Sequence, residues 1–146
     1  SGNISKELVS QGYTVHSTDL YNFGYGLSGV DFLNANMQEV DAIITNPPYS
    51  LKQEFLERAY LLGKPFAFLL PLTTFETEKR QNFFRCCGLE VILFDKRINF
   101  QTPDGKGDGS WFATAWFTNW MKIGQQLSFT SLDENIPDCP PCKTSD

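Results

Sequence analysis

The chain has 146 residues, enough for one domain around a single hydrophobic core. Hydrophobic residues make up 41% and charged residues 20%, as in ordinary globular proteins. No apolar run approaches the roughly 20 residues of a membrane span, and the polar amino-terminal segment does not resemble a signal peptide. The net charge of −5 at pH 7 argues against attraction of nucleic acid to the whole surface. A local basic surface formed by the lysines and arginines at positions 79–80, 96–97 and 106 stays as an alternative.

Cysteine and histidine usage does not predict a metal site. The four cysteines are the adjacent pair Cys86 and Cys87 and, near the end of the chain, Cys139 and Cys142. We interpret them as reduced thiols of a cytoplasmic protein. A structural zinc site needs about four ligands, whereas the only histidine, His16, falls within an expected strand.

The first thirty residues predict a helix, a strand and a loop. Residues 3–11 have helical spacing, with Ile4 and Leu8 on the apolar face, and Gly12 is placed to end the helix. Residues 13–18 alternate and are rich in β-forming side chains, which predicts a strand closed by Asp19. Residues 21–30 contain three glycines and are expected to form an irregular loop.

The rest of the chain alternates between expected strands and helices. Apolar runs predict strands at residues 41–45, 66–70, 90–95 and 111–120, and helical spacing predicts helices at 51–62 and 75–87. Residues 102–109 form an expected flexible turn. Residues 1–124 are therefore expected to form the domain. The polar segment 125–146 is expected to be a flexible tail.

This alternation predicts an α/β fold with a mainly parallel, twisted sheet. Short, continuously apolar strands fit a sheet that is covered on both faces. In such sheets, ligands bind at the carboxyl ends of the strands. Asp19, Asp31 and Asn46 follow or lie near such ends, so a site is expected where they meet.

Residues 46–49 read Asn-Pro-Pro-Tyr and join the strand at 41–45 to the helix at 51–62. This segment, in this strand–turn–helix context, resembles motif IV of the amino-methyltransferases that use S-adenosylmethionine. The bland alternative is a strand followed by a proline turn, because Pro-Pro marks loops in many proteins.

The resemblance implies a role for each of the four residues. The Asn46 side-chain oxygen and the Pro47 carbonyl would accept hydrogen bonds from the two N–H groups of an exocyclic amino group. This would free the nitrogen lone pair for methylation. Consecutive prolines preset the direction of that carbonyl, because Pro47 and Pro48 fix φ near −65°. Tyr49 would stack on the planar substrate group, a contact of roughly 1–3 kcal/mol for a nucleobase.

The stretch from residue 1 to about residue 120 is similar to the phage-type DNA adenine N6-methyltransferase-like proteins. The segments that carry the similarity are residues 1–5, 17–20, 29–33, 45–50, 97–100 and 109–110. The similarity implies that Asp19, next to Leu20, binds the ribose hydroxyls of S-adenosylmethionine. It also implies that Asp31, followed by Phe32, lies near the cofactor's adenine. Asn46 would border the same cofactor. The alternative for either aspartate alone is a helix cap or a turn.

The sequence departs from this family at its amino end. Ser1 and Gly2 look like the last two residues of the family's glycine-rich cofactor loop, and the strand and loop before them are not in the sequence. We therefore expect a Rossmann-like methyltransferase fold that lacks its first strand. Open strand edges favour pairing with another chain, so we expect a homodimer or a distorted sheet, with weak or absent cofactor binding by the monomer.

The leading functional hypothesis is transfer of a methyl group from S-adenosylmethionine to adenine N6 in DNA. Similar Asn-Pro-Pro-Tyr segments occur in enzymes that methylate RNA bases or protein glutamine, so those substrates stay open. A catalytically inactive remnant that acts as an assembly module is the hypothesis from another class. No metal and no membrane partner are expected.

Overall fold

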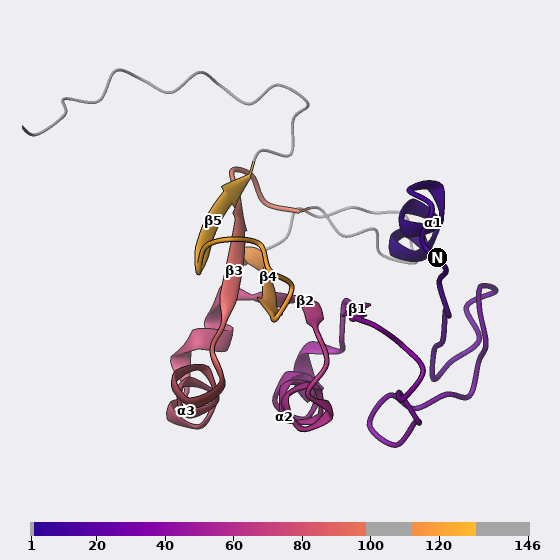
Figure 1. The fold of residues 1–146 in the computed structure, drawn as a ribbon, viewed down its shortest axis with the longest axis horizontal. Coiled ribbons are helices and arrows are strands. Elements are labelled where there is room, and N and C mark those ends of the chain that lie inside the picture. Colours follow the sequence, from indigo (N-terminus) through magenta and orange to yellow (C-terminus); the bar gives the residue numbers. More distant parts are fainter. Residues whose placement is uncertain (1, 99–111, 131–146) are drawn as a thin grey trace, which may run out of the picture.

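The computed structural model describes residues 2–98 and 112–130 (Figure 1). Within these ranges the helices are α1 (Asn3–Ser10), α2 (Lys52–Leu62) and α3 (Glu78–Cys87), with 3₁₀ turns η1 (Tyr49–Leu51) and η2 (Leu72–Glu76). The strands are β1 (Ile43–Thr45), β2 (Phe66–Pro71), β3 (Glu90–Phe94), β4 (Thr114–Asn119) and β5 (Leu127–Thr130). The expected loop at 102–109, together with Lys106, Cys139 and Cys142, lies outside the described residues.

The strands form one five-stranded sheet in the order β1-β2-β4-β3-β5. β1 pairs with β2, and β3 with β5, in parallel, whereas β4 is antiparallel to both β2 and β3. Four strands therefore share one direction, and β4 runs against them. The predicted α/β class is confirmed, but the sheet is mixed and not mainly parallel in its pairings, because β4 lies antiparallel between β2 and β3.

The core is centred on β2. All six residues of this strand are buried, and Phe66, Phe68 and Leu70 are fully so. Helix α2 packs its buried side chains Phe55, Leu56, Ala59 and Tyr60 into the same cluster. Helices α2 and α3 lie side by side (Figure 1), joined by a 2.5 Å ion pair between Lys79 and Glu57.

The amino-terminal prediction is only half confirmed. Helix α1 forms as expected, and Gly12, at φ 91°, follows its end. The strand expected at residues 13–18 was wrong, since this segment makes one isolated bridge, between Thr18 and Leu27. A β-forming sequence needs a neighbouring strand with which to pair, and no strand of the described chain lies along residues 13–17.

The other elements follow the sequence with shorter or shifted bounds. The expected helix at 75–87 is divided between η2 and α3 at Thr77, and the aromatic strand begins at Thr114. Within the segment expected to be a tail, Leu127–Thr130 forms β5, which pairs with the edge of β3. None of the helices in the described ranges is long and apolar enough to cross a membrane.

Strand β1 lies at one end of the sheet, and no strand of the described chain covers its outer edge. The sequence predicted open strand edges in the sheet, at the place of the family's missing first strand. The structure has the open edge at the sheet's end, since residues 13–18 do not join it.

Truncation of a central core side chain should destabilise the protein strongly. Phe68 is fully buried against Phe32, Phe55 and Phe66. We expect Phe68→Ala to lower the free energy of unfolding by about 3–5 kcal/mol in urea titrations. Leu61→Ala, at a side chain that is 80% exposed, is the control and should change it by less than about 0.5 kcal/mol. Equal stabilities of the two variants would contradict this assignment of the core.

Because the outer edge of β1 is open, we still expect the chain to self-associate. Light scattering should give a mass above the 16.6 kDa of one chain, and Ile44→Lys should reduce it, because edge lysines oppose strand pairing. The control is Leu127→Lys, which places a lysine on β5, the strand at the other end of the sheet, and should leave the mass unchanged. A monomeric wild-type chain, or equal effects of the two variants, would show that β1 is not the site of association.

Candidate functional site

The segment Asn46-Pro47-Pro48-Tyr49 leaves the carboxyl end of β1 and turns directly into helix. Pro47 is buried, whereas Asn46 and Pro48 are exposed. Pro48 has φ −57° and ψ 124°, and its carbonyl accepts a 2.9 Å hydrogen bond from the Leu51 amide. This bond closes η1, and α2 begins at the next residue. Asn46 is therefore exposed next to the buried Pro47, at the edge where ligands of α/β sheets bind.

Tyr49 forms an aromatic corner beside this segment. Its ring meets the ring of Phe112 at 5.5 Å between centroids and an angle of 75°, an edge-to-face contact. Burial raises the pKa of the Tyr49 phenol to about 12, so the ring is neutral at physiological pH. Lys52 donates a 3.1 Å hydrogen bond to the Tyr49 carbonyl and places a cation next to the corner.

Phe112 is a neighbour of the candidate site that the sequence did not reveal. It is 39% exposed and precedes β4. Its position follows from the antiparallel ladder in which Pro71 lies opposite Thr114, and from the 3.0 Å hydrogen bond that the Leu72 amide donates to the Ala113 carbonyl. No local pattern identifies this aromatic residue, because its neighbour Tyr49 is brought to it only by the pairing of β4 with β2.

The two aspartates are both turn residues in the structure. Asp19 Oδ1 accepts a 3.0 Å hydrogen bond from the Tyr21 amide, within residues that follow no regular strand. Asp31 Oδ1 accepts from the Leu33 amide at 3.0 Å, and its Oδ2 accepts from the Asn34 side chain at 2.6 Å. The turn alternative is thus realised for both, and Asp31 uses both of its carboxylate oxygens locally.

The remaining predicted cofactor residues lie in different surroundings. Gly2 has φ 65° and lies so close to Tyr25 that an added Cβ would be 2.3 Å from its ring. Leu20 is 49% exposed. Phe32 packs into the core, stacked on Phe55 at 4.7 Å. The structure therefore brings together residues 46–49 and adds Phe112 to them, whereas the amino-terminal candidates are held by contacts of their own.

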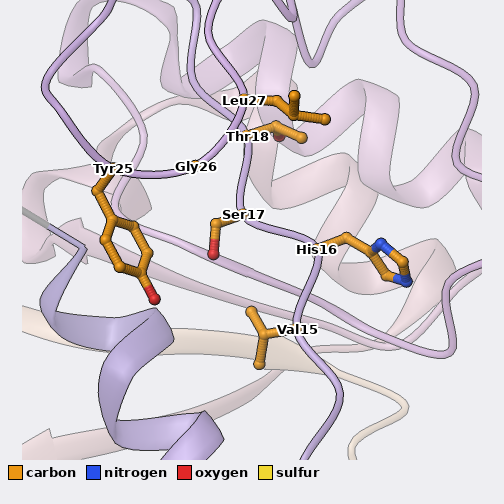
Figure 2. A pocket seen from close by; sticks show the side chains of 7 residues that line it. All are labelled: Val15, His16, Ser17, Thr18, Tyr25, Gly26 and Leu27. Carbon is orange, nitrogen blue, oxygen red and sulfur yellow. The ribbon is translucent and has the colours of Figure 1, made fainter.

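A hollow of about 350 Å³ lies among the amino-terminal segments. It is lined by Val15, His16, Ser17, Thr18, Tyr25, Gly26 and Leu27. Figure 2 shows the Tyr25 and Ser17 side chains directed toward the same space, with His16 pointing away from it. Within the described residues, no group of three or more His, Cys, Asp or Glu side chains could hold a metal ion.

No family model, curated protein or solved structure matches this chain. The features of the chain that bear on its function are therefore residues 46–49 and their contact with Phe112.

The raised pKa of Tyr49 predicts how its phenol titrates. An ordinary tyrosine has a pKa of 10.0, whereas Tyr49 holds its proton to about pH 12. The stability that this burial contributes is present below pH 10 and is lost as the pH rises toward 12. In a phenolate absorbance titration, Tyr49→Phe should remove a transition centred near pH 12. Loss of a transition near pH 10 instead would mean that the ring is solvated.

Proposed function

We propose that this chain belongs to a methyltransferase that moves a methyl group from S-adenosylmethionine to adenine N6 in DNA. The observation that carries the proposal is the position of residues 46–49 directly after the carboxyl end of β1, where the Tyr49 ring contacts Phe112. Two acceptors next to an aromatic face suit a planar ring that carries an amino group.

The surrounding architecture supports this location. β1, α2 and β2 form a parallel βαβ unit, and ligands of such units bind beyond the carboxyl ends of the strands. Helix α2 begins directly after the site, so the backbone of residues 46–51 is fixed at both ends. Preorganised acceptors of this kind stabilise charge that develops in the transition state without having to reorient.

The proposed chemistry assigns a separate task to each residue. Asn46 Oδ1 and the Pro47 carbonyl accept hydrogen bonds from the two N–H groups of the amino group and turn its lone pair toward the incoming methyl group. Tyr49 and Phe112 hold the ring in place and exclude water from one side. As the C–N bond forms, the C–S bond of the sulfonium would break, S-adenosylhomocysteine would leave, and the nitrogen would release one proton to solvent. S-adenosylmethionine, when bound, supplies the electrophilic methyl group.

The described residues fit this cofactor only in part. Asp19 presents a half-buried carboxylate whose Oδ1 is already oriented by the Tyr21 amide, and a carboxylate suits a pair of ribose hydroxyls. Gly2 does not fit the cradle that the family resemblance implies, because the Tyr25 ring fills the space above it. Asp31 and Phe32 are committed to a turn and to the core. The substrate half of the site is thus better formed than the cofactor half.

Two alternatives use the same observations. The acceptor pair at Asn46 and Pro47 also suits the N–H₂ group of an RNA base or a glutamine amide. An inactive assembly module is favoured by the Tyr25 ring over Gly2 and by the open edge of β1. Duplex DNA would also have to release its target base, at a cost of a few kcal/mol.

Labelled-methyl transfer separates these functions. Wild-type chain should label DNA containing adenine more than RNA or a glutamine peptide. Asn46→Ala should reduce turnover by about 10²–10³-fold, as loss of one preorganised hydrogen-bonding group does in other enzymes. The matched control is Asn36→Ala, whose side chain caps an exposed turn at the Gln38 amide, and its turnover should be unchanged.

The outcomes of this assay are distinct. Labelling of RNA or peptide alone would move the proposal to that substrate. Absence of transfer to all three would favour the assembly module. Equal turnover of Asn46→Ala and wild type would remove Asn46 from the mechanism.

A further inference from the structure

Arg80 of α3 is the one charged side chain among the described residues that is buried, at 8% exposure. Its Nε donates a 2.6 Å hydrogen bond to the Thr74 carbonyl, and Nη2 lies 3.5 Å from the Thr73 carbonyl. Nη1 lies 3.4 Å from Gln53 Oε1. All three acceptors are neutral, and burial lowers the pKa of the guanidinium although the nearby Glu76 raises it. A buried cation held by neutral oxygens is costly, so its placement calls for a specific reason.

The acceptors of Arg80 belong to the two segments that leave the carboxyl ends of β1 and β2. Thr73 and Thr74 lie in η2, directly after β2. Gln53 lies in the first turn of α2, directly after residues 46–51. Arg80 therefore connects, through one rigid planar group, the two loops that border the candidate site.

A second connection joins the same two loops on the other side. The Leu72 amide at the start of η2 donates to the Ala113 carbonyl, and the neighbouring Phe112 ring contacts Tyr49. Together with the hydrogen bond from Lys52 to the Tyr49 carbonyl, these contacts form a closed circuit. It runs from Tyr49 through Phe112, η2 and Arg80 to α2, and back to Tyr49.

The Gln53 side-chain amide is oriented by Glu57, which is not part of this closed set of contacts. Its Nε2 donates a 2.9 Å hydrogen bond to Glu57 Oε1, and Glu57 pairs with Lys79 at 2.5 Å. The amide oxygen is thereby turned toward Arg80. This arrangement fixes the distance between α2 and α3 at the point where the circuit closes.

We propose that Arg80 is a positioning residue that sets the separation of the Tyr49 and Phe112 rings by holding η2 against the start of α2. The identity of the group that binds beside those rings, a planar amino-bearing base, rests on the function proposed above. The geometric claim does not. A purely local role, in which Arg80 only packs α3 onto η2, would leave residues 49–53 insensitive to its loss.

Hydrogen exchange detected by mass spectrometry tests the positioning claim without requiring activity. Arg80→Gln should speed exchange in residues 72–77 and also in 49–53 by roughly tenfold, the factor for loss of one hydrogen bond to a charged group. Exchange in β2 and β4 should be unchanged. Arg80→Lys, which keeps the charge but not the planar fork, should be intermediate. Arg85→Gln is the matched control, since Arg85 is exposed on the same helix and pairs with Asn82.

Two results would overturn the proposal. Faster exchange confined to residues 72–87 would assign Arg80 a local role, and a uniform change across the sheet in Arg80→Lys would make it a general stability residue. If Arg80→Gln does not fold, the lysine variant alone decides between these results. Absence of methyl transfer by the wild-type chain, with the expected exchange pattern present, would count against the proposed function and leave the positioning role in place.

Discussion

The burial of β2 is the constraint on which the rest of the structure depends. Every residue of this strand is buried, and it pairs on one side with β1 and on the other, over six residue pairs, with β4. A strand buried on both faces and both edges must satisfy all its backbone groups through neighbouring strands. β1 and β4 are therefore fixed relative to each other although neither contacts the other in the sheet.

The candidate site follows from that arrangement. The parallel β1 delivers Asn46 to the edge at which β2 ends, and the antiparallel β4 begins at the same edge, so its approach segment carries Phe112 to Tyr49. Three segments distant in sequence thus meet where β2 becomes η2. Arg80 then connects η2 with α2, so the loops are held by side chains as well as by the sheet. Local rigidity of this kind is what a site needs if it is to hold acceptors in a preset direction.

The sequence was sufficient for features encoded locally. Apolar runs located β1 to β4, and helical spacing located the three helices. The choice of residues 46–49 as the candidate site came from the Asn-Pro-Pro-Tyr segment alone and stays a prediction. The β-forming letters of residues 13–18 were misleading, because strand formation depends on a partner that the described chain does not provide. The strand Leu127–Thr130 was not predicted, because its neighbours in the sequence are polar. It forms because the edge of β3 provides a pairing partner. Phe112 and Arg80 acquire their roles only through the β2–β4 ladder and the packing of α3, which no single-sequence pattern encodes.

The proposed methyl transfer requires S-adenosylmethionine to bind near the carboxyl end of β1. A calorimetric titration with S-adenosylmethionine tests it most directly, with Asp19→Ala measured in parallel. Because the cofactor half of the site is only partly formed, we expect weak but saturable binding by the wild-type chain. The variant should bind more weakly still, because the Asp19 carboxylate would hold the ribose. No saturable binding by the wild-type chain would contradict the enzyme reading and leave the assembly role.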